Sequence, residues 1–237
     1  MFSWLHAVTL ASVLWSLNAS SATLYLTEAP PYSYIKNGLS QGINVRIAEE
    51  ISLRSGIPLT IVIVPSSRHI NLFNQDKDGY SIALVENFND KDAPQLATVW
   101  QVPVALITKK EIILKSYEDI IPYVADKGLG VMRRLNYPHI GQDARIKRVE
   151  INTVANGLRM LQAERVAAIV ATLPGILDAI EKQEPQLQLG TPLIIGQTSF
   201  VLRSRAEAQN NPTSKLLAKA IENMIQDGSI RRLSTWN

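Results

Sequence analysis

The stretch "GINVRIAEEISLRSGIPLTIVIV", residues 42–64, holds two successive patterns that decide the fold class. Apolar residues first recur at the i, i+4 and i+8 spacing of one helix face, at Ile43, Ile47 and Ile51. Gly56 and Pro58 then end the helix. The following run, residues 59–64, is continuously apolar and rich in β-branched residues, which predicts a strand covered on both faces.

The segments on either side continue this alternation. Before it, "TLYLT" (23–27) predicts a short strand that enters the proline-containing loop "EAPPYSYIKNG". Beyond it, a helix is expected from Ser66, and a turn at Asp78-Gly79 leads to the buried strand "YSIALV". This order predicts a βαβαβ unit and therefore an α/β fold with a largely parallel sheet.

The pattern starts again after "VPVALITKK", which ends at Lys110. Ser116 and Asp119 have the spacing of a capping box at a helix start. Two further strands are expected at "GLGVM" and "RVAAIVA", a last strand at "TSFVLRS", and then a long amphipathic helix that stops at Gly228. Two βα units without a flexible linker between them predict two lobes joined by short strands.

Composition narrows the classes of function. The chain has 237 residues, 46% of them hydrophobic and 19% charged, which is ordinary for a soluble globular protein. The net charge of +3 is not gathered into a basic run, so nucleic acid is not expected as a partner. Cysteine is absent, which excludes disulfides, cysteine-bound metal and a lipid anchor on cysteine.

The first 22 residues predict a signal peptide. They contain no Asp, Glu, Lys or Arg, and their apolar part is shorter than the about 20 residues that span a bilayer. Ser20 and Ala22 stand at the −3 and −1 positions of a cleavage site before Thr23. A buried N-terminal helix is the alternative. No later segment is apolar enough to be inserted in a membrane, so we expect a soluble, monomeric protein in a Gram-negative periplasm.

Motifs for catalysis are missing from the sequence. His69 and His139 belong to no metal-binding spacing, and there is no GxSxG, GxGxxG or phosphate-binding glycine loop. Neither a metal nor a cofactor is expected. Glu86 and Asp90 are more informative because they follow a buried strand, where open α/β sheets bind ligands.

Four segments together resemble one known family. They are similar, in order, to the opening, the end of the first lobe, the centre of the second lobe and the C-terminal end of the periplasmic solute-binding proteins of amino-acid-type ABC transporters (family 3, type II fold). The segments are "PPYSYIKNGLSQGINVRIAEEISLRSG", "ALITKK", "LRMLQAERVAAIVATLPGI" and "NMIQDGSIRRLSTWN". The resemblance implies a two-lobed fold, each lobe a mostly parallel sheet flanked by helices, with the ligand cleft between the lobes.

The same resemblance implies how the lobes divide the chain. Lobe 1 would comprise residues 23–107 and 196–237, and lobe 2 residues 108–195, after a signal peptide at 1–22. The hinge would lie near Ile107–Lys109 and Ile194–Thr198. Tyr32 and Tyr34 would line the lobe-1 side of the cleft, where relatives stack an aromatic ring on the ligand.

Both charges that bind an α-amino acid in relatives are replaced here. The arginine that holds the α-carboxylate is matched by Asp92, with Lys91 beside it, and the acid that holds the α-ammonium is matched by Thr172. A standard amino acid is therefore not the expected ligand. Several cations favour an anionic or carboxylate-bearing solute, while two acids leave a cationic or hydroxylated solute open. The candidate ligand-binding residues are Glu28, Tyr32, Tyr34, Arg68, Glu86, Asn87, Asn89, Lys91, Arg133, Arg134 and Thr172.

Three functions compete. The first is a non-enzymatic binding protein that closes on a small polar solute, with an ABC permease or a membrane sensor as its partner. The second is a dehydratase-like enzyme on the same fold, with Glu86 as the candidate general acid. The third is a degenerate member that binds a protein partner through its lobes.

Overall fold

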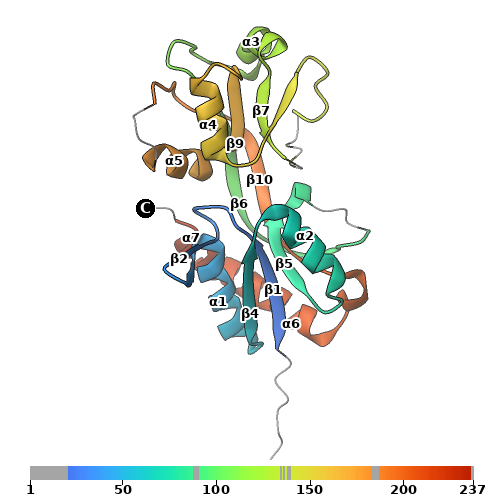
Figure 1. Cartoon of the computed structure of the whole chain (residues 1–237). Coiled ribbons are helices and arrows are strands. Elements are labelled where there is room, and N and C mark those ends of the chain that lie inside the picture. The colour runs from blue at the N-terminus through green and yellow to red at the C-terminus, as the bar shows by residue number, and fades with distance from the viewer. Residues whose placement is uncertain are drawn as a thin grey trace, which may run out of the picture.

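The computed structural model describes residues 21–87, 91–133, 135, 137, 140–182 and 187–235. Figure 1 shows two bodies arranged end to end and joined by two long strands. Most of the predicted signal peptide, residues 1–20, lies outside the described residues. The expected two-lobed α/β architecture is confirmed.

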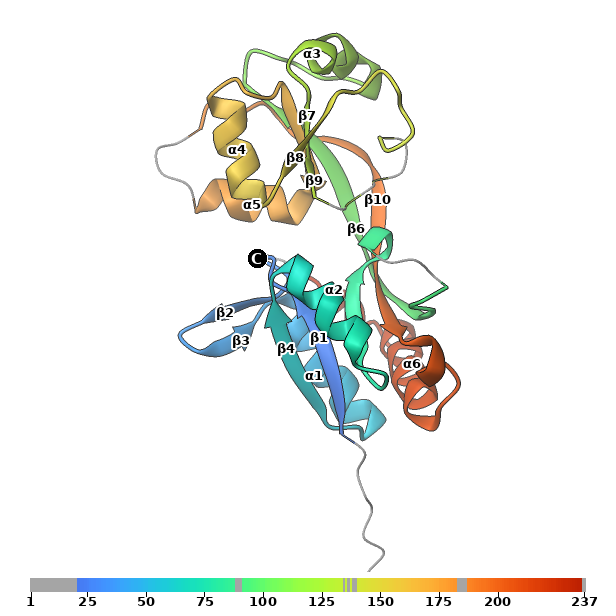
Figure 2. The ribbon, with the colours of Figure 1, turned by 45° about the vertical axis from the view of Figure 1, so that its right-hand side comes forward.

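Lobe 1 is the body built from both ends of the chain. Its strands and helices are β1 (Ala22–Thr27), β2 (Tyr34–Lys36), β3 (Leu39–Gln41), α1 (Ile43–Ser55), β4 (Leu59–Val64), α2 (Ser66–Gln75), β5 (Tyr80–Leu84), α6 (Pro212–Gln226) and α7 (Ser229–Leu233). Two 3-10 turns, Val85–Asn87 and Ala206–Ala208, complete it. In Figure 2 the β2–β3 hairpin projects from the side of this body.

Lobe 2 is formed by the middle of the chain. Its elements are a 3-10 turn (Tyr117–Ile120), α3 (Ile121–Asp126), β7 (Leu129–Met132), β8 (Arg148–Ile151), α4 (Val154–Gln162), β9 (Ala168–Thr172) and α5 (Leu173–Glu181). The capping box expected from Ser116 and Asp119 is present, and it starts the 3-10 turn before α3. Pro174 stands in the first turn of α5, where its missing N–H costs no helix hydrogen bond.

One eight-stranded sheet runs through both lobes in the order β4-β1-β5-β10-β6-β9-β7-β8. The strands β4, β1 and β5 are parallel in lobe 1, and β8, β7 and β9 are parallel in lobe 2. Between them, β6 (Gln95–Thr108) and β10 (Leu193–Ser204) pair antiparallel with each other and with both lobes. The chain therefore passes from one lobe to the other along these two strands.

The end of strand β6 pairs with the sheet of lobe 2. Residues 104–108 of β6 pair with β9, and Ala105 and Ile107 pack in the hydrophobic cluster of lobe 2. The boundary at residue 107 and the position of the hinge stay predictions. The pairing shows which part of β6 moves with β9 if the lobes rotate.

The stretch that decides the fold forms the expected helix and strand. Helix α1 buries Ile43, Ile47 and Ile51 and ends at Gly56, whose φ of 69° is left-handed, as a terminal glycine allows. The strand β4 was expected to be covered on both faces, and it is covered only in part. Both α1 and α2 contact it, but β4 lies at the edge of the sheet and most of its residues are only half-buried.

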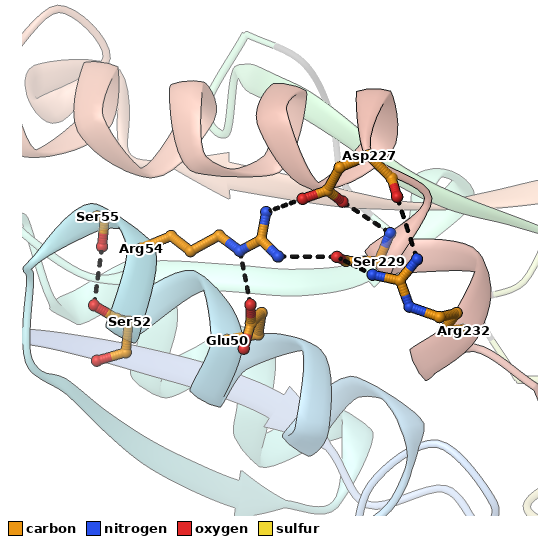
Figure 3. Close-up of polar contacts among 7 residues, drawn as sticks. All are labelled: Glu50, Ser52, Arg54, Ser55, Asp227, Ser229 and Arg232. Carbon is orange, nitrogen blue, oxygen red and sulfur yellow. Dashed lines mark hydrogen bonds and ion pairs between the residues drawn. The ribbon is translucent and has the colours of Figure 1, made fainter.

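Polar contacts join the two chain ends within lobe 1. Figure 3 shows Arg54 of α1 between Glu50, on the same helix, and Asp227 and Ser229 at the α6–α7 turn. Its Nε donates to Glu50 Oε1 at 2.6 Å, and its Nη2 donates to Ser229 Oγ at 2.7 Å. Arg232 also donates to Ser229 Oγ, at 2.7 Å. We call this group the α1–α6 contact.

Candidate functional site

A cavity of about 310 Å³ lies between the lobes. Its walls lie at the carboxyl ends of the parallel strands of each lobe. These strands are β1, β4 and β5 in lobe 1 and β7, β8 and β9 in lobe 2. Ligands in open α/β folds bind at this edge of the sheet, because the strand ends present loop backbone and helix starts there. The cavity is therefore the candidate functional site.

An aromatic cluster lies at the lobe-1 wall, where two of its members, Tyr32 and Phe200, line the cavity. The Tyr32 ring lies 4.8 Å from the Phe200 ring and 5.8 Å from the Trp100 ring, measured between centroids. Trp100 and Phe200 are directly paired on β6 and β10, and their rings stack with an interplanar angle of 13°. Trp100 Nε1 donates to Asn44 Oδ1 at 3.0 Å, which satisfies its buried N–H. Tyr32 and Phe200 thus give the lobe-1 side of the cavity an aromatic surface.

Tyr32 reaches from this wall into lobe 2. Its hydroxyl donates to Thr172 Oγ1 at 2.6 Å, and both residues are only 5% exposed. Gly175, in the first turn of α5, also lies beside the Tyr32 ring, since a Cβ on it would be 3.9 Å from Tyr32 Cε2. Burial raises the pKa of the Tyr32 phenol well above its usual range, so the hydroxyl stays protonated and remains a donor.

A second contact between the lobes involves Tyr34. The Nζ of Lys182, at the end of α5, lies 5.4 Å from the centroid of the Tyr34 ring, within cation–π range. Lys182 also pairs with Asp178 at 2.6 Å. The two tyrosines of one loop therefore contact the two ends of one helix in the other lobe.

Charge is scarce among the described residues that line the cavity. Arg133, directly after β7, is the one charged side chain there, and its Nε pairs with Glu150 Oε2 at 3.0 Å. The remaining polar groups are neutral, and include Thr27, Ser66, Ser67 and Asn152. Tyr137 is also part of the wall; it is 2% exposed, and burial raises the pKa of its phenol. The described part of the site thus offers an apolar surface with hydroxyl and amide groups and one cation, Arg133.

A buried histidine lies next to the lobe-1 wall. His69 on α2 is 1% exposed, and its ring nitrogens lie 2.6 Å from Thr27 Oγ1 and 2.8 Å from Ser81 Oγ. Burial lowers the pKa of His69 to about 4. The ring is therefore neutral at pH 7 and fixes Thr27, which lines the cavity.

The structure brings some of the predicted site residues together and not others. Tyr32, Arg133 and Thr172 line the cavity. Glu86 lies outside the lining, where both of its carboxylate oxygens accept from the Thr198 hydroxyl at 2.6 and 2.7 Å. The other described candidates are also outside the lining: Glu28, Arg68 and Lys91 are exposed, and Tyr34 is half-buried on β2.

Three candidates are placed only in part or not at all. For Asn87 the structure describes its backbone, in the 3-10 turn after β5. Asn89 and Arg134 lie outside the described residues. Their roles stay predictions, as does the role of every candidate as a ligand contact.

Sequence reasoning missed much of the cavity wall. Phe200 and Tyr137, which line the cavity, and Trp100, which packs against Phe200, were not among the candidates. Trp100 and Phe200 meet only through the pairing of β6 with β10, which are 100 positions apart in the chain. The available signal was an isolated aromatic residue in each of two strands, and it does not reveal which face of the strand borders the cavity.

Other kinds of site are not apparent in the described part of the chain. Within residues 21–235, gaps excepted, no three His, Asp or Glu side chains gather in a way that suits a metal ion. None of the described helices is both long and apolar enough to cross a membrane.

No family model and no curated protein matches this sequence. Solved structures do match. A histidine kinase sensor domain with similarity to periplasmic binding proteins aligns at 15% identity and a TM-score of 0.72, covering 90% of this chain and 94% of that one. The fold is that of the two-lobed periplasmic binding proteins.

Transport proteins with this periplasmic-binding-protein fold match equally well. The arginine-, lysine-, histidine-binding protein ArtJ of Geobacillus stearothermophilus aligns at 11% identity and a TM-score of 0.71, covering 90% of this chain and 93% of that one. An amino acid ABC transporter substrate-binding protein of Streptococcus pneumoniae, bound to L-arginine, aligns at 16% identity and a TM-score of 0.69, covering 90% of this chain and 92% of that one. At these identities the similarity establishes the fold, and the expectation of a type II binding-protein fold is confirmed.

Proposed function

We propose that this protein is a divergent member of the amino-acid-type solute-binding family that encloses a small solute between its lobes, for ABC import or for sensing. The observation that carries the proposal is the cavity of about 310 Å³ whose walls come from both lobes. A cavity of this size holds a small molecule and no macromolecule. The transport and sensor proteins that share the fold support both kinds of partner.

The chemistry of the wall supports a solute with an apolar body and one carboxylate. The aromatic surface of Tyr32 and Phe200 suits an aliphatic chain or a ring. Arg133 is the only cation among the described lining residues, which favours one anionic group at the lobe-2 rim. An α-amino acid would also need a buried acid for its ammonium group, and Thr172 stands where relatives have that acid.

The enzyme alternative receives no comparable support. Its candidate general acid, Glu86, is outside the cavity lining and already accepts a hydrogen bond from Thr198. A binding role needs no such group.

A thermal-shift screen of the mature protein tests the function and the solute class together. Small monocarboxylic acids with apolar bodies should raise the unfolding temperature, and free amino acids should not. A ligand at 100 times its Kd stabilises by about 2.7 kcal/mol, which such a screen detects. Amino acids as the only stabilising compounds would contradict the solute class, and turnover of any stabilising compound would favour the enzyme.

Arg133→Gln should weaken binding of the carboxylate found in that screen. The matched control is Arg159→Gln, which makes the same substitution at an exposed position of helix α4 in the same lobe, outside the cavity lining. Equal affinities of the two variants would show that Arg133 does not bind the solute.

Periplasmic location is part of the proposal and rests on the predicted signal peptide. N-terminal sequencing of exported protein should begin at Thr23. Intact Met1 on cytoplasmic material would contradict it.

A further inference from the structure

The loop after β1 is held in one conformation by backbone hydrogen bonds. The N–H of Tyr32 donates to Ala29 O at 2.8 Å, and the Tyr32 carbonyl accepts from Asn44 N, at the start of α1, also at 2.8 Å. A Cβ on Gly42 would lie 2.3 Å from the Tyr32 carbonyl oxygen, so the loop and the start of α1 are in close contact. Tyr32 is therefore part of lobe 1 and moves with it.

The hydroxyl of this fixed tyrosine satisfies groups of lobe 2. It donates to Thr172 Oγ1, and the Tyr32 ring lies beside Gly175; both residues belong to the β9–α5 junction. A solute bound at this junction would use the same groups. Tyr32 thus occupies, from within the protein, a polar position that a solute would otherwise take.

Tyr34 adds a contact that is independent of the first. Its ring lies beside the Lys182 ammonium, at the other end of α5, while Tyr32 lies at the beginning of that helix. Two contacts at separate points on α5 resist rotation of lobe 2 better than a single contact does. Both must break when the lobes separate.

We propose that Tyr32 and Tyr34 form a clasp that keeps the lobes closed when no solute is bound. The clasp involves no reaction with a solute. It supplies contacts between the lobes that a bound solute would otherwise supply. Tyr32 also determines specificity, since it excludes solutes that need Thr172 and the start of α5. The inference concerns the protein without solute and so stands apart from the identity of the solute.

The test measures the distance between the lobes in protein freed of solute by unfolding and refolding. Because the chain has no cysteine, Glu49→Cys on α1 and Arg159→Cys on α4 provide two exposed labelling sites, one in each lobe. Pulsed electron spin resonance between labels on these residues should give one short, narrow distance distribution for the otherwise unchanged protein. A long or broad distribution would overturn the proposal.

Variants identify what holds the lobes together. Tyr32→Phe removes only the hydroxyl and should lower the ratio of closed to open protein about fivefold, as expected for the loss of one net hydrogen bond. Lys182→Met should also lower the ratio, and the double variant should be mainly open. The control Tyr25→Phe removes a hydroxyl that bonds Asp76 within lobe 1, and it should leave the distribution unchanged.

Two results would overturn the clasp even in a closed protein. One is a double variant that stays as closed as the parent protein; the other is a Tyr25→Phe variant that opens as much as Tyr32→Phe. Lys182→Met keeps the test decisive if Tyr32→Phe does not fold, because the Lys182 side chain is 56% exposed and its loss leaves the core intact. A Lys182→Met variant with an unchanged distribution would then count against the clasp.

Discussion

The α1–α6 contact and the Tyr32 clasp both join segments far apart in the sequence, but they differ in what they join. Arg54 and Asp227 are 173 positions apart and lie in the same lobe, whereas Tyr32 and Thr172 are 140 positions apart and lie in different lobes. The first contact is partly exposed, with 26% of the Arg54 side chain accessible, and the second is almost fully buried. One contact lies within a lobe made from both chain ends, and the other joins the two lobes.

The difference teaches which contacts should affect folding and which should affect closure. A contact inside lobe 1 forms when that lobe folds and should persist whether the lobes are open or closed. A contact between lobes is lost on opening, so its removal changes the balance of two folded states. The predictions below separate these two effects.

The largest effect is expected at Gly42, the N-cap of α1, which packs against the Tyr32 loop. Gly42→Ala would place a Cβ 2.3 Å from the Tyr32 carbonyl oxygen, at a residue whose φ is 120°. Overpacking together with backbone strain should lower the free energy of unfolding by about 4 kcal/mol. The clasp should open as well, because the Tyr32 loop must shift.

Gly38→Ala is the matched control for that substitution. Gly38 also has a positive φ, of 76°, but a Cβ there meets nothing within 4 Å. It should cost about 1 kcal/mol, from the backbone conformation alone, and leave the clasp closed. If urea unfolding gives equal losses of unfolding free energy for the two variants, the Tyr32 loop is not packed tightly against Gly42.

The second largest effect is a pH dependence confined to lobe 1. His69 is neutral in the fold with a pKa of about 4, while an unfolded histidine titrates near 6.5. The unfolded chain therefore binds the proton first as the pH falls. The stabilisation is complete above about pH 6.5 and is lost as the pH falls through about 4, a total of about 3 kcal/mol.

Urea unfolding from pH 7 to pH 4 checks this, with His69→Gln as the comparison. Acids such as Asp143 and Asp227, whose pKa values are lowered by hydrogen bonds, affect both proteins alike, so the difference isolates the histidine. The clasp should not respond, because burial raises the pKa of Tyr32. Parallel pH profiles for the two proteins would contradict the role given to His69.

Much of the fold could be predicted from the sequence because its signals are local. The isoleucines of α1, the Gly56 end and the Ser116 capping box depend on residues a few positions apart, and each is present as expected. Whether β4 is central or at an edge depends on sheet order, which a β-branched run does not encode. The order of strands was accessible mainly through the resemblance to a family.

The site was less predictable because its contacts are not local. Tyr32 was identified as an aromatic residue on a stiff loop at the cleft, and it lies there. Its partner Thr172 was identified as a missing acid, and the bond between the two depends on how the lobes close. Lys182 beside Tyr34 has no signal in the sequence, since a lysine at the end of a helix is common and its neighbour belongs to the other lobe.

The third prediction tests the clasp from the lobe-2 side. Thr172→Val removes the Oγ1 that accepts from Tyr32, and it removes no helix cap, since the Thr172 side chain makes no capping hydrogen bond to α5. The ratio of closed to open protein should fall about fivefold, while the urea midpoint should change little. Thr60→Val, at an exposed position of β4, is the control and should change neither. A large loss of folding stability without opening would make Thr172 a folding residue instead.

The smallest effect is expected at the α1–α6 contact, even though Arg54 has more polar partners than Tyr32. Arg54 contacts Glu50, Asp227 and Ser229, but water reaches these groups and competes for them. Arg54→Met should therefore lower the unfolding temperature only slightly, and 1 M salt should reduce the difference from the parent, because ions screen exposed pairs beyond about 3 Å.

The control for Arg54→Met is Lys219→Met, which breaks an exposed pair with Glu222 inside α6 and joins no separate segments. If the α1–α6 contact holds lobe 1 together, Arg54→Met should lower the unfolding temperature more than Lys219→Met in low salt, and both should stay closed. Equal changes would mean that hydrophobic packing alone joins the two helices. Opening of the lobes in Arg54→Met would be the more serious result, because a contact wholly inside lobe 1 would then control closure, and the separation between folding contacts and closure contacts would fail.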